Sequence, residues 1–510
     1  MCAFALRHLL HKALKKTFTK RLAGAQSVMT YRNYGSRTIF ALSSGSTKCA
    51  VAVLRVSGPN SAIALQQICG GLPKQRVASL RKLHDPISKE LLDKSLVIWF
   101  PGPQSFTGED CAEFHVHGGP AVVKSVLTAF SSIPGLFPAQ PGEFTKQAFL
   151  NGKLDLTEVE GLGDLIHAET EAQRKQALRQ MDGDLGALYS SWRQGLLKCL
   201  ANIEAFIDFH EEENIEDDIL ESVSSVVNIL KDDILKHLSD SRCGERLREG
   251  LSVVIAGEPN VGKSSLLNSI CQRPAAIVSP IAGTTRDIVE TALNIAGYPV
   301  LLSDTAGLRE TNDPIEKEGV NRAMDRMVSS DLKILVVDAI KQLNILTGEI
   351  QLTDFVVSKM EELRLLDKSQ SYEDISRGDL SCTVVVLNKM DLVHSVDVSR
   401  FLERHGDHVC TISCLTGQGF DDFMEKLVKK IKNLCGDPLQ GSPSLTHTRY
   451  RYHLEQCHLH LHNFHDLMSD DVVLAAEKLR LAVGEVGQIT GAVSAEDILD
   501  VIFRDFCIGK

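Results

Sequence analysis

The 510-residue sequence lacks the features of several protein classes. It has no run of about 18 apolar residues, the length that a helix needs to span a bilayer, and stretches such as Ile334 to Val337 are only strand-sized. Its 13 cysteines are scattered and form no CxxC pair, so the sequence indicates neither a disulfide framework nor a zinc ribbon. With 43% hydrophobic and 24% charged residues, the composition is that of a soluble globular protein. At about 150 residues per domain, about three or four domains are expected.

Acidic residues are missing from the first 37 residues, which contain eight Lys and Arg residues interleaved with Phe and Leu. A basic, acid-poor segment that forms an amphipathic helix is typical of a mitochondrial transit peptide. The alternative is a solvated basic tail that binds anionic surfaces. We therefore expect residues 1–37 to be a transit peptide and the protein to work in the mitochondrial matrix.

Hydrophobic patterning divides the rest of the chain into four segments. Residues 38–153 alternate short β-branched runs with Gly and Pro turns, which predicts an α+β domain. Residues 154–249 and 435–510 show apolar residues at helical spacing, whereas residues 250–434 alternate strands with helices. The fold class is thus multidomain: an α+β domain, then an all-α domain interrupted by an inserted α/β domain. The segment between Ala339 and Cys382 is expected to be a flexible insertion in that domain.

A phosphate-binding motif follows the first strand of the inserted domain. The pattern GxxxxGKS begins at Gly257, between an apolar strand and a predicted helix. Backbone N–H groups of such a loop cradle phosphates, the lysine reaches the β and γ oxygens, and the serine hydroxyl binds Mg²⁺. The candidate nucleotide-binding residues of this loop are Gly257, Asn260, Val261, Gly262, Lys263, Ser264 and Ser265.

Three later motifs appear in the order expected of a Ras-like P-loop GTPase. The first motif follows the strand Val300 to Leu302, and its acidic residue is placed near Mg²⁺. The second includes an aspartate that accepts two N–H groups from a guanine edge, which adenine does not offer, so the nucleotide is GTP. The third resembles a short loop behind the guanine ring. Their candidate residues are Asp304, Thr305, Ala306 and Gly307; Asn388, Lys389 and Asp391; and Ser413 and Cys414.

Leu308 occupies the position at which Ras-type enzymes carry a water-orienting glutamine. Catalysis then needs other groups. Glu316 or Glu318 is a candidate for positioning the water, and Arg309 for stabilising phosphate. Oxygen atoms of the loop from Ser279 to Asp287, together with Asn260, are candidates for holding a monovalent cation near the phosphates. In the alternative, that loop only supplies Thr285 to Mg²⁺ and a partner protein provides an arginine.

Several motifs together resemble the MnmE/TrmE family of tRNA-modification GTPases. The resemblance extends over residues 38 to 510. Its motifs are Phe106–Asp110, His117–Gly119, Pro141–Lys146, Ala148–Leu156, Gly283–Asp287 and Phe506–Lys510. The family's architecture, a folate-binding and dimerising N-terminal domain plus a helical domain with an inserted G domain, agrees with the partition above.

The resemblance also implies roles for individual residues. It implies that Asn260, Ser279, Ile281 and Thr284 coordinate K⁺, that Ser264 and Thr285 hold Mg²⁺, and that Glu316 is the water-orienting catalytic acid. It further implies that 5-formyl- or 5,10-methylene-tetrahydrofolate binds at Arg55, Glu113, Lys153 and Lys510. At His115 and His117 the family more commonly has other residues, and we expect these two histidines to be strand residues and not ligands.

The function implied by the resemblance is modification of tRNA. A K⁺-dependent GTPase cycle of dimerising G domains, working with a flavoprotein partner of the MnmG type, installs a folate-derived group at C5 of the wobble uridine of mitochondrial tRNAs, giving 5-taurinomethyluridine. The homodimer is expected to work within a larger hetero-oligomer. The alternative is a GTP switch of the Era/Der type in mitoribosome assembly, although such proteins carry a KH-type RNA domain that the sequence lacks.

Overall fold

A computed structural model describes most of the chain. The described residues are 37–45, 47–209, 218–240, 242–273, 276–278, 290–304, 325, 327–342, 351–365, 380–393, 402–403, 405–468, 470–493, 499, 502–504 and 506–510. They form two compact units. The first comprises the described residues up to Gly163 and those from Thr490 to Lys510, and the second runs from Asp164 to Ile489.

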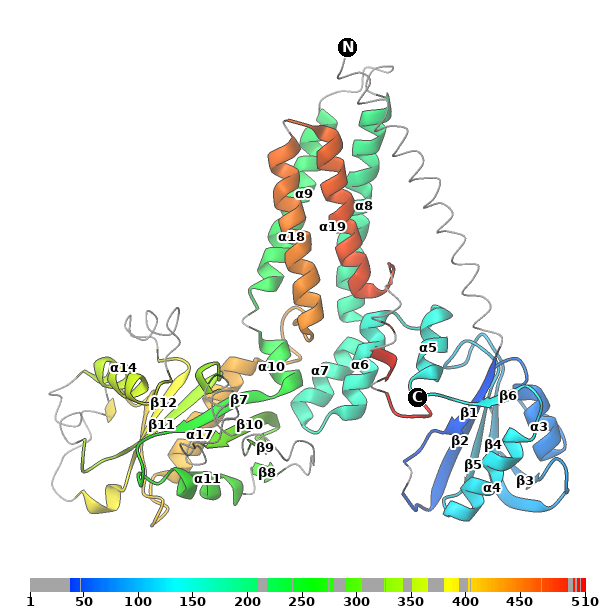
Figure 1. The fold of residues 1–510 in the computed structure, drawn as a ribbon, viewed down its shortest axis with the longest axis horizontal. Coiled ribbons are helices and arrows are strands. Elements are labelled where there is room, and N and C mark those ends of the chain that lie inside the picture. Colours follow the sequence, from blue (N-terminus) through cyan, green and yellow to red (C-terminus); the bar gives the residue numbers. More distant parts are fainter. Residues whose placement is uncertain are drawn as a thin grey trace, which may run out of the picture. The chain divides into compact units, whose positions relative to one another are not determined.

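A six-stranded sheet dominates the first unit, in the order β3-β4-β5-β2-β1-β6. Helices α3 and α4 cover one face, where alternate residues such as Leu54 and Phe114 form a buried core with Phe130 (Figure 1). Arg55 comes directly after Leu54, and Glu113 comes directly before Phe114. Because the side chains of a strand alternate between its two faces, Arg55 and Glu113 project from the opposite face. The elements are β1 (Thr38–Leu42), β2 (Val51–Ser57), α3 (Ser61–Cys69), β3 (Ser79–His84), β4 (Leu91–Phe100), β5 (Cys111–His117), α4 (Pro120–Ser131) and β6 (Leu136–Pro138).

The C-terminal residues return to this unit. Phe503 and Phe506 pack in a small core with Leu156 of α6 (Leu156–His167), next to α5 (Glu143–Leu150). Beyond them, Ile508 forms a β-bridge with Pro141. Gly509 has φ of +98°, and a Cβ atom built there would lie 2.2 Å from the carbonyl oxygen of Leu42. Only glycine allows this approach, which holds the last residues against the end of β1.

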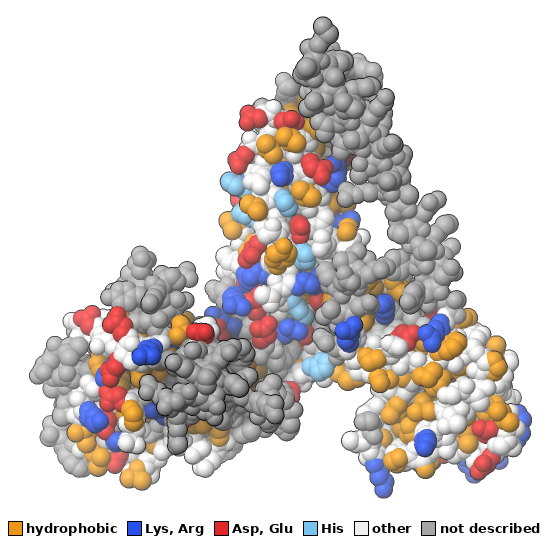
Figure 2. Space-filling model, in the orientation of Figure 1, with side chains coloured by type: hydrophobic (Ala, Val, Ile, Leu, Met, Phe, Trp, Pro, Cys, Tyr) orange, Lys and Arg blue, Asp and Glu red, His pale blue; other side chains and the backbone are white. Residues whose placement is uncertain are grey.

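Four long helices of the second unit share one hydrophobic core (Figure 1). Residues before and after the inserted domain contribute to it, among them Tyr189, Val227, Leu454 and Leu479. The helices are α8 (Asp184–Phe209), α9 (Asp218–Leu238), α18 (Thr448–Met468) and α19 (Val472–Thr490), preceded by α7 (Glu171–Met181). On the face visible in Figure 2, acidic, basic and histidine side chains are interspersed along this bundle.

A seven-stranded sheet in the order β13-β12-β11-β7-β10-β9-β8 forms the inserted domain. Strands β10, β7, β11, β12 and β13 are parallel; β9 runs antiparallel to β10, and the edge strand β8 pairs antiparallel with β9. Every residue of β11 and β12 is buried because helices cover both faces. The strands are β7 (Leu251–Ala256), β8 (Ala276–Val278), β9 (Glu290–Ile295), β10 (Tyr298–Asp304), β11 (Leu332–Asp338), β12 (Thr383–Asn388) and β13 (Val409–Thr411); the helices are α11 (Lys263–Cys271), α14 (Leu352–Glu362) and α17 (Phe420–Cys435), with the 3₁₀ turn η3 (Met390–Leu392).

Helix α14 falls within the segment expected to be a flexible insertion. Its Phe355 and Val356 are buried in the core on one face of the sheet, with Val385 of β12. This part of the segment therefore belongs to the packed domain, whereas residues 366–379 lie outside the described residues.

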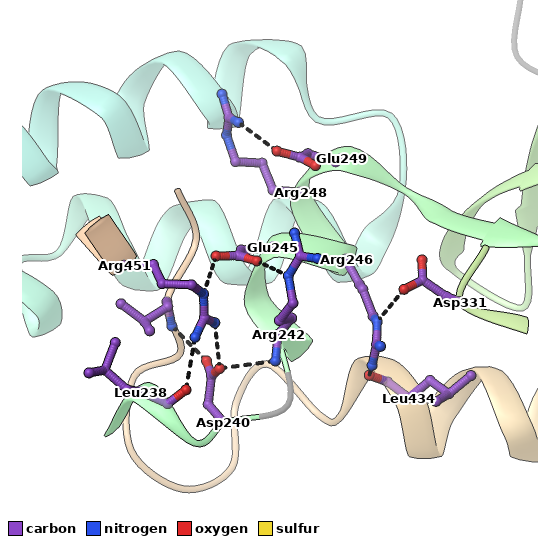
Figure 3. Close-up of polar contacts among 11 residues, drawn as sticks. Leu238, Asp240, Arg242, Glu245, Arg246, Arg248, Glu249, Asp331, Leu434 and Arg451 are labelled. Atoms are coloured by element: carbon purple, nitrogen blue, oxygen red, sulfur yellow. Dashed lines mark hydrogen bonds and ion pairs between the residues drawn. The ribbon is translucent and has the colours of Figure 1, made fainter. Parts of the chain in front are cut away.

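The short helix α10 (Cys243–Glu249) joins the bundle to the inserted domain (Figure 3). Arg246 donates to Asp331, just before β11, at 2.8 Å and to the carbonyl oxygen of Leu434 in α17 at 3.3 Å. On the bundle side, the Glu245 carboxylate, 1% exposed, accepts from Arg242 and, at 2.8 Å, from Arg451 of α18. Paired charges thus connect α10 to both neighbours.

No helix within the described part of the chain is long and apolar enough to cross a membrane. The domain limits expected from the sequence, at residues 38–153, 154–249, 250–434 and 435–510, stay a prediction.

Candidate functional site

The glycine-rich loop between β7 and α11 needs both of its motif glycines. A Cβ atom built at Gly257 would lie 2.2 Å from the carbonyl oxygen of Val336, and one built at Gly262 would lie 2.2 Å from Nδ2 of Asn388. Gly262 also has φ of +103°. The loop therefore packs closely against β11 and the end of β12 in a conformation that side chains would block. Its backbone leads into the N-terminus of α11, where N–H groups are free to bind phosphate.

Lys263 and Ser264 begin α11 beside the end of β10. The Lys263 ammonium is buried and donates to the carbonyl oxygens of Gly257 and Glu258, both at 2.8 Å. Burial lowers the pKa of Lys263, and the nearby Asp304 carboxylate opposes that shift. The Ser264 hydroxyl donates to Asp304 at 3.1 Å. A hydroxyl and a carboxylate placed together in this way are oxygen ligands of the type that Mg²⁺ prefers.

Asn388, at the end of β12, connects the three loops of the site. Its Nδ2 donates to the carbonyl oxygen of Val261 at 2.8 Å, and its Oδ1 accepts from the N–H of Cys414 at 3.0 Å. Ser413, next to Cys414, donates from Oγ to Asp391 at 2.6 Å. These contacts bring the residues expected to read the base into one cluster that is joined to the phosphate loop.

Lys389 lies beside this cluster and pairs with Asp338 at the end of β11, at 2.8 Å. Burial opposes the charged form of Asp338, but the hydrogen bond from Lys389 holds the pKa of that carboxyl below its usual value. Of the remaining loop residues, Val261 packs into the core and Ser265 lies exposed in the first turn of α11.

Several candidate residues lie outside the described residues, so the structure gives no geometry for them. Asn260, which has φ of +65°, is the one member of the expected K⁺ ligand set that is described. The candidates outside the described residues are Ser279, Ile281, Thr284, Thr285, Thr305, Ala306, Gly307, Arg309 and Glu316.

On the N-terminal sheet, Arg55 of β2 lies directly opposite Glu113 of β5. The Arg55 guanidinium donates from both Nε and an NH2 group to Oε1 of Glu113, at 3.1 and 2.8 Å. Its carbon atom lies 5.3 Å from the ring centre of Phe106 and 5.7 Å from that of Phe144. The two charged side chains are only 15% and 20% exposed. Because little water screens the pair, its two charges attract each other more strongly than those of an exposed ion pair.

The C-terminal Lys510 lies in the field of this pair. Burial and the positive charge of Arg55 lower the pKa of Lys510, whereas Glu113 and Cys507 raise it. Three of the four expected folate residues are therefore close together. The fourth, Lys153, donates to the carbonyl oxygen of Pro103 at 3.2 Å, on the loop that carries Phe106.

Sequence reasoning missed three side chains at this cluster. Phe106 and Phe144 flank Arg55, and the His115 ring lies 3.6 Å from Glu113. The available signal was the alternation along β5, which places His115 on the same face as Glu113.

A mainly parallel sheet, a glycine-rich loop that leads into a helix and a polar cluster joined to that loop define a P-loop GTPase domain, here inserted between helices that share one core. Two family models match the chain. The model described as "GTP-binding protein TrmE N-terminus" matches residues 38–153, and "MnmE helical domain" matches residues 156–507.

Curated relatives match the chain along nearly its whole length. The Danio rerio protein "5-taurinomethyluridine-[tRNA] synthase subunit GTPB3, mitochondrial" is 52% identical, covering 99% of this chain and 100% of that protein. The Homo sapiens protein of the same name is 49% identical, over 96% and 97%. "tRNA modification GTPase MnmE" of Parvibaculum lavamentivorans is 46% identical, over 93% and 100%. The chain belongs to the MnmE/TrmE family, which confirms the resemblance carried by the motifs.

Proposed function

We propose that this protein is a mitochondrial GTPase that takes part in the C5 modification of the wobble uridine of mitochondrial tRNAs, giving 5-taurinomethyluridine. The observation that carries the proposal is the presence, in one chain, of a guanine-reading cluster around Asn388 and Asp391 and of the Arg55, Glu113 and Lys510 cluster. The names of the relatives support the same activity. The names of these three relatives give no support to a switch in mitoribosome assembly.

GTP hydrolysis uses the loop before α11. Lys263 neutralises the β and γ phosphate oxygens, and backbone N–H groups at the start of α11 hold them. Ser264 and Thr285 would hold Mg²⁺, with Asp304 hydrogen-bonded to Ser264. Asn260, Ser279, Ile281 and Thr284 would hold K⁺, which would supply positive charge near the phosphates. Glu316 orients the attacking water, and Arg309 stabilises the phosphate.

The N-terminal cluster fits a reduced folate. Two cations, Arg55 and Lys510, suit a glutamate tail or a formyl oxygen. Glu113 keeps Oε2 available to accept N–H groups of a pterin edge because Arg55 occupies Oε1. Lys153 is the further cation. A folate held by these residues would supply the one-carbon unit for the methylene at C5.

The proposal also concerns partners and location. The substrate is a mitochondrial tRNA, and a flavoprotein of the MnmG type completes the modification. The chain forms a homodimer within a larger hetero-oligomer and works in the mitochondrial matrix. These assignments rest on membership in the family.

The test combines turnover with analysis of the tRNA. Purified protein should hydrolyse GTP much faster in K⁺ than in Na⁺ at equal ionic strength, and Lys263→Ala should abolish hydrolysis in both. In cells whose own gene is deleted, the wild-type chain should restore 5-taurinomethyluridine, measured by mass spectrometry of mitochondrial tRNA, and Lys263→Ala should not. Modification that persists without the chain, combined with defective ribosome assembly, would favour the switch.

A further inference from the structure

His115 carries a buried ring nitrogen with no hydrogen-bond partner among the described residues. The nitrogen is Nε2, and it lies 3.6 Å from Oε2 of Glu113, too far for a hydrogen bond. The side chain as a whole is 28% exposed, so the ring borders the open face of the sheet. A role in strand packing alone does not explain the position, because a buried polar atom without a partner costs free energy.

The two carboxylate oxygens of Glu113 have different surroundings. Oε1 accepts both hydrogen bonds from Arg55, whereas Oε2 faces the imidazole. A lone pair on Nε2 directed at a carboxylate oxygen would be repelled, so the carboxylate favours the tautomer that carries a proton on Nε2. At the border of the open face of β5, an acceptor, Oε2, thus lies beside a buried donor, Nε2–H.

His117, two residues further along β5, provides a contrast. It lies on the same face but is 72% exposed, and its Nδ1 is 2.8 Å from Oδ1 of Asp93. Asp93 also accepts the backbone N–H of His117 at 2.9 Å. His117 therefore has a hydrogen-bond partner within the protein, and of these two histidines only His115 is left to bind something else.

We propose that His115 is a specificity-determining residue that reads, together with Glu113, a lactam edge on the bound ligand. An acceptor and a donor side by side match an N–H group beside a carbonyl group. In a 4-oxopterin, N3–H donates to Oε2 of Glu113 while O4 accepts from Nε2 of His115. The inference rests on the proposed folate site, and it assigns a ligand contact to a side chain that the sequence alone places only in a strand.

Two ligands that differ at this lactam edge test the contact. Folic acid has N3–H beside a carbonyl group at position 4, whereas aminopterin has an amino group at position 4 and no proton on N3, so it can neither accept the His115 proton nor donate from N3 to Glu113. Dissociation constants are measured by calorimetry on the full-length protein and on His115→Phe, His115→Gln and His117→Phe. Thermal unfolding verifies that each variant is folded. The binding of 5-formyltetrahydrofolate to the wild type is measured alongside.

His115→Phe should weaken folic acid binding about tenfold, the value of one net hydrogen bond, and leave aminopterin nearly unchanged. His115→Gln should keep most of the preference because its amide also donates, and His117→Phe should match the wild type. Equal losses for both ligands, no loss at all, or a Gln variant that behaves like the Phe variant would each overturn the assignment of His115. A wild-type protein that binds none of the folates would instead overturn the proposed folate site itself.

Discussion

Asn388 donates from Nδ2 to the carbonyl oxygen of Val261 at 2.8 Å, which joins the end of β12 to the phosphate loop. The same side chain accepts the N–H of Cys414 at 3.0 Å. One buried amide thus fixes the segments proposed to read the base relative to the loop proposed to hold the phosphates. Nucleotide affinity and stability of the G domain should depend together on this side chain.

Replacing Asn388 by alanine should therefore weaken both. The variant leaves the Val261 carbonyl and the Cys414 N–H without their partner, at a cost of about 1–3 kcal/mol in the free energy of unfolding. GDP affinity should fall as well, because the loops lose their mutual position. Urea denaturation and fluorescent GDP titration measure the two effects. Asn268→Ala, at an exposed position of α11, is the control and should change neither.

Asp391 should determine the choice of base. Its carboxylate accepts a hydrogen bond from Ser413 at 2.6 Å, which orients it. Asp391→Asn replaces one acceptor oxygen by an NH₂ donor, which suits the 2-oxo group of xanthine and clashes with the 2-amino group of guanine. GTP affinity should fall by about 10- to 100-fold while XTP affinity rises. Competition titration with GTP, XTP and ATP checks this; Asp407→Asn, at an exposed residue, should keep the preference for GTP.

The histidine buried between α8 and α9 should make stability depend on pH. His237 lies 3.1 Å from the hydroxyl of Tyr189, and burial lowers the pKa of its imidazole to about 4. An unfolded chain has the ordinary histidine pKa of about 6.5, so between these values the unfolded state binds more protons. Stability should consequently fall as the pH is lowered from 6.5 toward 4, by roughly 2 kcal/mol at pH 5.

Comparison with a variant isolates this contribution. His237→Gln keeps a group that can bond to Tyr189 but does not titrate, so its urea midpoint should change less than that of the wild type between pH 7 and pH 5. His462→Gln, at a side chain that is 61% exposed, should follow the wild type. Parallel curves for the wild type and His237→Gln would contradict the prediction.

Local patterns predict the elements that carry the nucleotide motifs. The strand expected at Val300 to Leu302 lies within β10, and the strand and helix expected on either side of the GxxxxGKS pattern are β7 and α11, because β-branched runs and helical spacing depend on nearby residues. The unpaired His115 was not predicted, because alternation assigns residues to two faces without showing which face α3 and α4 cover. The sequence after Ala339 did not predict that α14 packs into the core.

Local patterns also could not predict that the C-terminal residues pack against the end of β1. No periodicity connects Gly509 with Leu42, and the expectation that Lys510 joins Arg55 came only from the resemblance to the family. In the structure, the approach depends on the absence of a Cβ atom at Gly509. This dependence can be tested without altering any residue proposed to touch folate.

Gly509→Ala should displace the C-terminal residues. The new methyl group would lie 2.2 Å from the Leu42 carbonyl oxygen, on a residue whose φ of +98° already disfavours side chains. Lys510 would then leave the field of Arg55 and Glu113, so affinity for 5-formyltetrahydrofolate should fall toward that of Lys510→Ala. GTP hydrolysis by the inserted domain, whose site lies in the other compact unit, should stay close to the wild-type rate.

Gly484→Ala is the matched control. A Cβ atom built at Gly484, within α19, has no atom within 4 Å, and alanine favours a helix more than glycine does. This variant should keep full folate affinity and equal or greater stability. Calorimetric titration of both alanine variants, with GTP turnover measured on the same preparations, separates the outcomes. If Gly509→Ala bound folate as tightly as Gly484→Ala, the C-terminal approach would not be needed to place Lys510 at the site.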